Sequence, residues 1–310
     1  MKKTLITLAL AGLLGAYVAS PALSQQPAAK KAATPAYKAP ASARVAGKPD
    51  LSGVWKVMNT ANWDIEPHAA KSALFMRAGP IVPVPAAEVL ALGAIGAVPA
   101  GMGVVEGGTI PYTPEGRAKQ RENVANYIEW REVGTPMEHM KARDPEVNCY
   151  LPGVPRANYM NLPFQIFHSD RAMLIAYEYA GATRNVLFGD VGPAPVDSWM
   201  GQSAARWEGD TLVVTVTGQL DSTWFDRAGN HHSGEMRVVE RWTPTSATTM
   251  RYEAEITDPV TFTRPWKMSM NLYKLQGEDG RLQQFKCVEF VEELIYGHLR
   301  KTRLPYSRPR

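Results

Sequence analysis

Titratable side chains are concentrated in segment 218–235, which holds Asp221, Asp226, His231, His232 and Glu235. Histidine titrates near neutral pH, so a histidine oriented by a carboxylate can act as a general acid or base. Asp226 and His232 are six residues apart in one predicted loop. This spacing predicts acid–base chemistry with His232 as base and Asp226 or Asp221 as its orienting carboxylate. The alternative is a hydrogen bond that only stabilises the loop.

His168 is a further catalytic candidate, with a packed histidine as the alternative. Adjacent histidines rarely bind one ion together, so His231 and His232 do not predict a metal centre. The sequence lacks the phosphate-loop, dinucleotide and His-Glu-x-x-His motifs, and it has no Gly-x-Ser-x-Gly elbow. We therefore expect neither a metal nor a cofactor.

Other side chains suit the binding of a small molecule, because aromatic rings supply apolar area and a few polar groups orient the ligand. The expected ligand-binding residues are Arg156, Gln165, Trp199, Trp224, Glu240, Arg264 and Trp266. The tryptophans could instead close one end of the fold. Glu240 alternates with Val238 and Trp242, so it is expected inside, either in a salt bridge with an arginine such as Arg206 or in a functional role.

Alternating sequence from residue 165 onward predicts the elements that position these groups. In 250–256, apolar Met250 and Tyr252 alternate with Arg251 and Glu253, as in a half-buried antiparallel strand. Strands are predicted at 53–55, 173–179, 184–188, 203–207, 211–217, 236–242, 250–257, 265–274 and 281–290. We expect a mainly β fold, an antiparallel up-and-down meander forming a lipocalin-like barrel. A two-sheet β-sandwich is the alternative.

Two further elements precede the strand-rich part. The Pro/Gly-rich stretch 60–112 predicts an arm packed over the barrel. Thr113-Pro114-Glu115 predicts the start of a helix that runs to about Trp130. We expect one or two helices in total. In a meander, successive connections lie at opposite ends. The approach to 173 and the long loops 189–202, 218–235 and 258–264 should therefore share one end, where they carry most candidate residues.

The N-terminus has the pattern of a secretory leader: a basic start, an uncharged run at 4–19 and small residues at Ala22 and Ser24. We expect a signal peptide at 1–24, a disordered linker at 25–49, a single β-rich domain at 50–299 and a basic tail at 300–310. The protein would be periplasmic or secreted. The leader's apolar run is short for a membrane span, so no membrane insertion is expected.

Charge and cysteine content narrow the possible partners. Residues 1–49 contain seven basic residues and no acid, which leaves 27 basic and 30 acidic residues in the remainder. A mildly acidic body gives no support for nucleic-acid binding. In an oxidising compartment the two cysteines, Cys149 and Cys287, are expected to form a disulfide; two buried free thiols are the alternative. The oligomeric state does not follow from the sequence.

Seven stretches are distinctive: 62–68, 103–108, CYLPGVPR at 149–156, RWEGDTLVV at 206–214, TWFDRAGN at 223–230, 238–241 and FTRPW at 262–266. Together they resemble a family of uncharacterised secreted bacterial proteins over nearly all of 50–290. The resemblance implies no activity. It does imply the Cys149–Cys287 bridge, since these relatives usually carry both cysteines. His231 and Gly234 depart from the family pattern, which usually has an aromatic residue or proline and an acid there, so Glu235 would have to replace that acid.

These features predict an enzyme that uses His/Asp acid–base chemistry on a small apolar or aromatic molecule at the long-loop end of a β-barrel. Hydrolysis, elimination or isomerisation would fit such groups. A non-catalytic periplasmic carrier or sensor of a similar ligand is the alternative, since a carrier tolerates a pocket without titrating groups. A structural role in the cell envelope is the third possibility.

Overall fold

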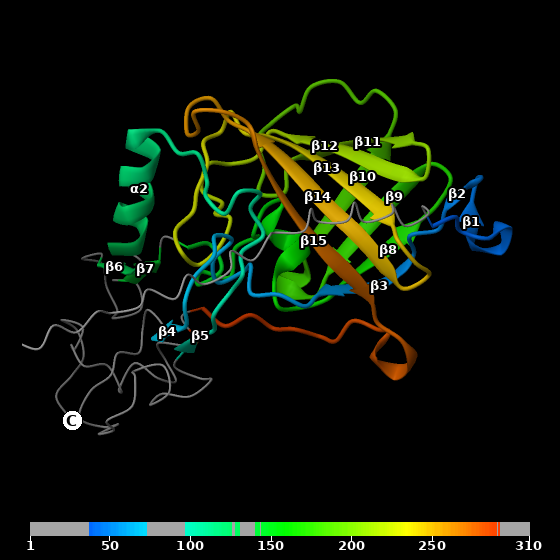
Figure 1. Cartoon of the computed structure of the whole chain (residues 1–310), viewed down its shortest axis with the longest axis horizontal. Coiled ribbons are helices and arrows are strands. Elements are labelled where there is room, and N and C mark those ends of the chain that lie inside the picture. Colours follow the sequence, from blue (N-terminus) through cyan, green and yellow to red (C-terminus); the bar gives the residue numbers. More distant parts are fainter. Residues whose placement is uncertain are drawn as a thin grey trace, which may run out of the picture. The chain divides into compact units, whose positions relative to one another are not determined.

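Nine strands close into a barrel in the computed structural model, which describes residues 37–72, 97–125, 128–130, 140–142, 144–289 and 291 (Figure 1). In order around the barrel they are β3 (Gly53–Val57), β8 (Phe164–His168), β9 (Ala172–Tyr177), β10 (Thr183–Phe188), β11 (Gln202–Glu208), β12 (Thr211–Thr217), β13 (Arg237–Pro244), β14 (Thr249–Thr257) and β15 (Trp266–Lys274), which pairs back onto β3. The predicted mainly β, lipocalin-like barrel is confirmed.

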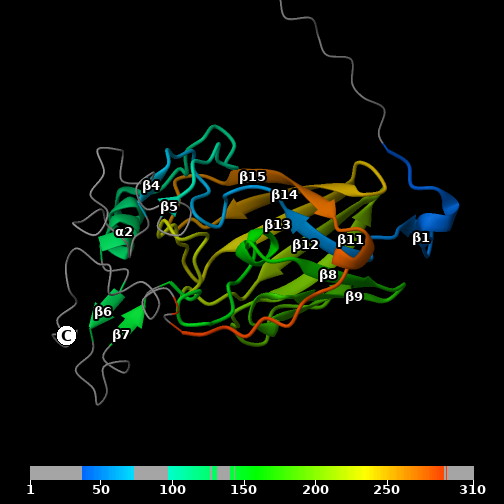
Figure 2. The same ribbon diagram turned by 90° about the horizontal axis from the view of Figure 1, so that it is seen from below.

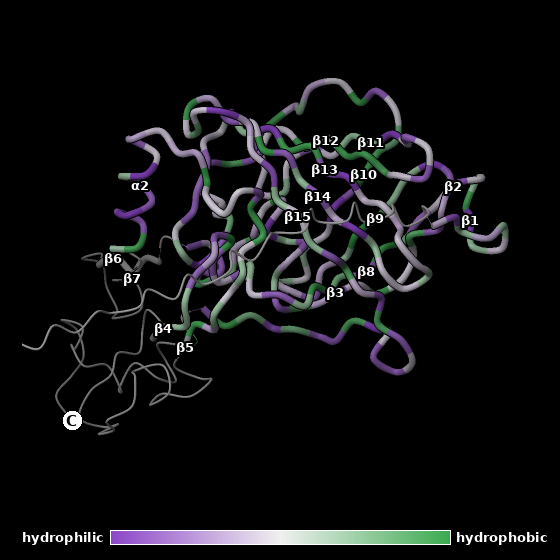
Figure 3. The backbone as a smooth tube through the Cα atoms, viewed as in Figure 1, coloured by the Kyte–Doolittle hydropathy of each residue, from purple (hydrophilic) through white to green (hydrophobic). Residues whose placement is uncertain are grey.

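The apolar core lies inside this barrel. On β14, Met250, Tyr252, Ala254 and Ile256 are buried, whereas the residues between them are half-buried. This is the predicted alternation, and Figure 3 shows the hydropathy of each residue along the chain. Because side chains alternate across a strand, each strand contributes one face to the core and one to the outer surface.

One pair of neighbouring strands departs from the predicted antiparallel meander. β10 and β11 are parallel, and only Val186–Phe188 pair with Ser203–Ala205, whereas the other neighbours around the barrel are antiparallel. Parallel neighbours cannot be joined by a tight turn. The segment 189–201, which we call the crossing segment, therefore runs from one end of the barrel to the other.

Two strand predictions were wrong. β8 was missed, and residues 281–289, predicted as a strand, are not part of any sheet in the described chain. The first end of the barrel, which we call the loop end, carries 145–163, 218–236 and 258–265. The second, the hairpin end, carries the turns 169–171, 209–210 and 245–248. Because β8 runs from the loop end to the hairpin end, His168 lies at the hairpin end. The sequence had placed it with the long loops, which lie at the other end.

The arm and the helix follow β3. Val105 forms a bridge with Met268, and the Glu106 amide donates to the Lys267 carbonyl, so the described part of the arm packs along β15 (Figure 2). The helix α2 (Pro114–Ala125) starts as predicted, since the Gly116 amide donates to Thr113 Oγ1 at 3.0 Å. It ends five residues before Trp130.

Smaller elements complete the described chain. Three short pairs lie outside the barrel: β1 (Arg44–Val45) with β2 (Lys48–Pro49), β4 (Lys71–Ser72) with β5 (Ala97–Val98), and β6 (Ile128–Trp130) with β7 (Met140–Ala142). Four 3₁₀ turns are η1 (Ala41–Ala43), η2 (Arg156–Tyr159), η3 (Tyr179–Gly181) and η4 (Gly277–Asp279). None of the helices described is long and apolar enough to cross a membrane.

The predicted disordered linker 25–49 includes residues that are part of the folded structure. Residues 37–49 contain η1 and the β1–β2 hairpin, and Arg44 binds both carboxylate oxygens of Asp210 at 3.0 and 2.8 Å. The predicted leader 1–24, the rest of the linker and the tail 300–310 lie outside the described residues.

The predicted disulfide is present. Cys149 and Cys287 are bonded, with 5.7 Å between their Cα atoms and a sequence separation of 138 residues. It attaches the non-strand segment 281–289 to the chain that leads into β8. A second contact holds this segment, because the Gln283 amide donates to the Glu178 carboxylate at 2.8 Å.

Candidate functional site

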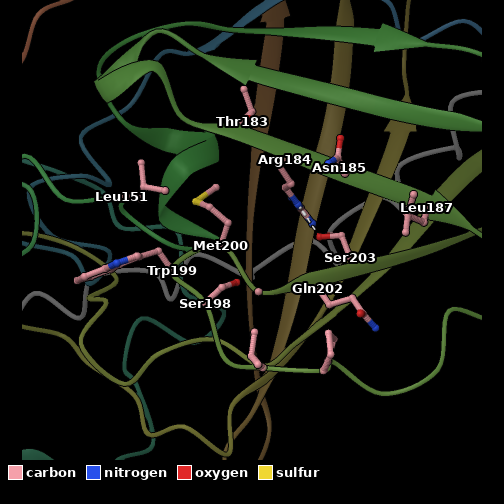
Figure 4. A pocket seen from close by; sticks show the side chains of 13 residues that line it. Leu151, Thr183, Arg184, Asn185, Leu187, Ser198, Trp199, Met200, Gln202 and Ser203 are labelled. Atoms are coloured by element: carbon pink, nitrogen blue, oxygen red, sulfur yellow. Dashed lines mark hydrogen bonds between the residues drawn. The ribbon is translucent and has the colours of Figure 1, made fainter.

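A pocket of about 450 Å³ lies where the crossing segment returns to the start of β11 (Figure 4). We call it the wall pocket. It is lined by Leu151, Thr183, Arg184, Asn185, Leu187, Pro195, Val196, Ser198, Trp199, Met200, Gly201, Gln202 and Ser203. The parallel pairing accounts for its position, because Thr183–Asn185 precede the paired residues of β10 and the crossing segment passes beside them.

The apolar side of the wall pocket is built around Trp199. Its ring packs on Tyr150 with centroids 5.2 Å apart, and Leu151 and Met200 lie beside it in the lining. Met200 is buried, whereas Trp199 is only half-buried. The ring is therefore held on one side and keeps free surface for a ligand, which fits the role predicted for it.

Arg184 forms the polar base of the wall pocket. Its Nε donates to Ser203 Oγ at 2.8 Å, and its guanidinium forms a buried ion pair with Glu240. Glu240 also accepts from Asn158 Nδ2 and from the Tyr252 hydroxyl, both at 2.8 Å. Glu240 thus points inside as predicted, and its partner is Arg184 rather than Arg206, which is exposed.

His232 is enclosed at the loop end. Its Nδ1 lies 2.8 Å from the Ser233 carbonyl, which can only accept, so Nδ1 carries the proton. Its Nε2 then accepts from the Thr223 hydroxyl at 2.6 Å. Burial lowers the pKa of His232 to about 4, which keeps the ring neutral at neutral pH. Both ring nitrogens are engaged within the protein.

Neither predicted carboxylate partner forms a hydrogen bond with His232, whose partners are Thr223 and Ser233. Asp226 is buried and accepts from the amides of Ile65 and Ala228 and from Asn230 Nδ2, at 2.8, 2.9 and 2.7 Å. Burial, and next the negative charge of Asp64, raise the pKa of Asp226 to about 8. Asp221 is exposed. The structure therefore brings the three residues to the same end of the barrel without joining them by hydrogen bonds.

The buried His232 predicts a pH-dependent difference in stability. Because its folded pKa lies below its ordinary value, it contributes stability above about pH 6.5 that is lost as the pH falls toward 4. Relative to a His232→Gln variant, the wild type should lose about 2–3 kcal/mol between pH 7.5 and 4.5. Urea denaturation at both pH values measures this. A difference that does not change with pH would show that the ring is not held neutral.

Several predicted ligand-binding residues have structural contacts instead. Arg156 is fully buried and binds both oxygens of Asp144 at 2.6 and 3.0 Å, Glu146 at 2.6 Å and Asn62 at 2.9 Å. Arg156 is thus part of a buried ionic network between the loops. It does not line the wall pocket.

The remaining candidates are spread over the barrel. Trp266 is buried and packs edge-on against Phe225 and Phe262, and Trp224 is buried as well. Arg264 is exposed, and Gln165 is half-buried beside exposed Phe167. Among the predicted ligand residues, Trp199 alone lines the wall pocket. Arg184 was missed, although its alternation with Val186 and Phe188 places an arginine on an inward face.

A second pocket, of about 330 Å³, lies at the hairpin end. We call it the end pocket. It is lined by Val45, Ala46, Lys48, His168, Ser169, Asp170, Phe188, Gly189, Ala205, Arg206 and Trp207. The catalytic candidate His168 is therefore on a pocket, but not the one that contains Trp199.

Comparison with protein-family models, curated proteins and solved structures found no match. The family resemblance of the sequence stretches accordingly stays a prediction. Among the described residues, no three His, Cys, Asp or Glu side chains are grouped as metal ligands.

Proposed function

We propose that the protein is a non-catalytic carrier or sensor that binds a small uncharged molecule with an apolar or aromatic part in the wall pocket. The observation that carries this proposal is the lining. Among the residues that the structure describes, it combines Trp199, Leu151 and Met200 with hydroxyl and amide groups and contains no histidine, carboxylate, lysine or cysteine. A site of this composition can bind and orient a ligand but offers no side-chain pair for proton transfer.

The charge of the ligand follows from the base of the pocket. Arg184 is the one charged group among the described lining residues, and its charge is balanced by Glu240. An anionic ligand would have to compete with the buried Glu240 carboxylate, whose two oxygens already bind the Arg184 guanidinium. A neutral molecule can accept hydrogen bonds from Asn185 or Gln202 without disturbing the ion pair. This supports an uncharged, partly apolar ligand.

The expected export of the protein is part of the same proposal. A disulfide persists in oxidising compartments such as the bacterial periplasm and is rare in the cytosol. The Cys149–Cys287 bond therefore supports the periplasmic or secreted location that the leader pattern predicts. The alternative, an acid–base enzyme built on His232 and Asp226, stays a prediction that the described contacts do not favour.

A Trp199→Ala variant should lose most of the binding. The variant removes the largest apolar contact surface of the wall pocket, and burial of such a ring contributes about 1.5–3 kcal/mol, which corresponds to a roughly 10- to 100-fold loss of affinity. Native mass spectrometry of protein purified from its own host, before and after denaturation, is the measurement. We expect a co-purifying molecule, recovered chemically unaltered, on the wild type and not on Trp199→Ala.

A Phe167→Ala variant is the matched control, because Phe167 is an exposed aromatic residue on the outer face of β8. It should retain the ligand. An empty wild-type protein, or equal retention by both variants, would contradict the assignment of the wall pocket. Release of a chemically converted molecule would favour the enzyme.

A further inference from the structure

The wall pocket borders a strand edge that has no partner among the described strands. β10 pairs with β9 from Thr183 to Leu187, but it pairs with β11 only from Val186 to Phe188. Thr183–Asn185 therefore have a neighbouring strand on one side only, and they line the wall pocket with the other (Figure 4). An unpaired edge of this kind can bind an additional strand.

The backbone groups of this edge point toward the pocket at every second residue. In an antiparallel pair, the hydrogen-bonded positions alternate along the strand. The Tyr177 amide donates to the Ala182 carbonyl at 2.8 Å, so the even-numbered residues of β10 bond to β9. The Gly189 amide donates to a carbonyl of β11 at 3.2 Å, so the odd-numbered residues bond on the other side. The amides of Thr183 and Asn185 are therefore directed away from β9.

The chain turns away before it can cover this edge. Continued three residues upstream, the register of β10 with β11 would place Met200 opposite Thr183. Instead, Gly201 has a φ of +63° and its amide donates to the Ser198 carbonyl at 3.3 Å, which bends the chain there. Ser198 in turn forms a bridge with Gln219, so the crossing segment is held by the loop after β12. In the described chain, no backbone hydrogen bond joins the crossing segment to the edge of β10.

The two sides of this gap suit an extended peptide. The edge presents main-chain donors and acceptors over three residues, which is about 10 Å of strand. On the crossing segment, the half-buried ring of Trp199 offers free surface for a large apolar side chain. Arg184 is paired with Glu240, so the described lining has no net charge and favours uncharged side chains and chain ends. The volume of about 450 Å³ is within the range for ligand sites and fits a short segment.

We propose, building on the ligand-binding role proposed above for the wall pocket, that its ligand is an extended, uncharged peptide segment of about three residues, which adds as a strand to the edge of β10. The Thr183 amide donates to a carbonyl of the peptide, and a large apolar or aromatic side chain of the peptide packs on Trp199. In this mode of binding, main-chain hydrogen bonds supply affinity and side-chain pockets supply specificity.

The first test varies the ligand. The probe is the tripeptide alanyl-phenylalanyl-alanine with an acetylated N-terminus and an amidated C-terminus, titrated into the isotope-labelled protein and followed by NMR. We expect saturable shifts of the Thr183 and Asn185 amides and of the Trp199 indole, with no comparable shift of the Trp207 indole in the end pocket. The same peptide methylated at each backbone nitrogen keeps the side chains but has no N–H to donate and cannot approach a strand edge closely. It should bind at least about 10-fold more weakly.

The second test varies the edge itself. Thr183 is the first residue of β10, and Ala182 before it has φ −59° and ψ 143°, a conformation that suits a residue preceding proline. Thr183→Pro and Thr183→Ala remove the same exposed side chain, but only Thr183→Pro removes the amide N–H. Relative to Thr183→Ala, it should bind the tripeptide about 2- to 10-fold more weakly, the contribution of one main-chain hydrogen bond. The two variants should bind benzyl alcohol, an uncharged aromatic probe without a peptide backbone, equally.

Urea denaturation shows whether both variants fold, and the methylated peptide tests the same contact if Thr183→Pro does not. Equal tripeptide affinity of the two folded variants, or equal affinity for the methylated and unmethylated peptides, would overturn strand addition. If benzyl alcohol then still shifts the Trp199 indole saturably, the carrier function of the wall pocket stands and only the peptide proposal fails. No shift with any of the probes would count against both proposals.

Discussion

An Arg156→Met variant is expected to lose about 3–5 kcal/mol of unfolding free energy, because it removes the buried cation that binds both Asp144 and Glu146. Arg156 and Asp144 are fully buried, and Glu146 is nearly so. Arg227 also binds Glu146, at 2.7 Å, so Glu146 keeps one cation in the variant. Urea denaturation of the two proteins measures the difference.

The controls separate this structural role from the ligand-binding role that the sequence predicts for Arg156. Arg264→Met, at an exposed arginine of the same end of the barrel, should change stability by less than about 0.5 kcal/mol. The double variant Arg156→Met/Asp144→Leu should regain part of the loss, since it also removes the buried carboxylate that Arg156 binds at both oxygens. A stable Arg156→Met protein that no longer binds its ligand would restore the original prediction.

Removal of the disulfide should have the second large effect. Loss of a link between residues 138 apart increases the entropy of the unfolded chain, which corresponds to about 5 kcal/mol at most in the loop-closure model. Measured values are commonly about 2–4 kcal/mol. We expect a loss in this range for Cys149→Ser/Cys287→Ser, measured by urea denaturation with reduced wild-type protein for comparison.

The same variant should also change how the chain is cleaved. Residues 281–289 pair with no strand of the described chain, so the disulfide, the Gln283 contact with Glu178 and the packing of Phe285 on Tyr179 hold this segment. Limited trypsin digestion should therefore cut at exposed Lys286 earlier in the variant than in the wild type. Equal stability and equal cleavage would show that the bond adds nothing to the attachment of this segment.

Local signals account for what could be predicted from the sequence. The alternation of 250–256 predicts β14, the turn Glu208-Gly209-Asp210 predicts the pairing of β11 with β12, and Thr113-Pro114-Glu115 predicts the start of α2. In each case the residues that specify the element are neighbours in the chain. Hydrophobic period, turn chemistry and helix capping act over such short distances.

The errors have a common physical origin in pairing between distant residues. β8 has five residues, and one of its partners is β3, more than a hundred residues earlier. Residues 281–289 alternate like a strand but pair with none of the described strands, because β3 already occupies the free edge of β15. The parallel pairing of β10 with β11 likewise depends on which edge is available. Local patterns do not contain this information.

The candidate site was predicted in part. Trp199 lines the wall pocket and Glu240 lies inside the barrel, and these two positions agree with loop placement and alternation. His232 and Asp226 form no hydrogen bond with each other in the described chain, because each side chain already has hydrogen-bond partners nearer to it. Thr223 and Ser233 satisfy His232, and backbone amides and Asn230 satisfy Asp226. Sequence spacing limits which residues can meet but does not decide among competing partners.

The parallel pairing of β10 with β11 places part of the wall pocket on a connecting segment rather than on the strands of the barrel. A connection between parallel neighbours has to be long whatever its residues are, and the crossing segment that satisfies this requirement also supplies Val196, Ser198 and Trp199 to the wall pocket. Val196 and Ser198 are exposed, so exchanging them alters no buried packing. Substitutions at these two positions should therefore change the lining of the wall pocket while the barrel stays the same.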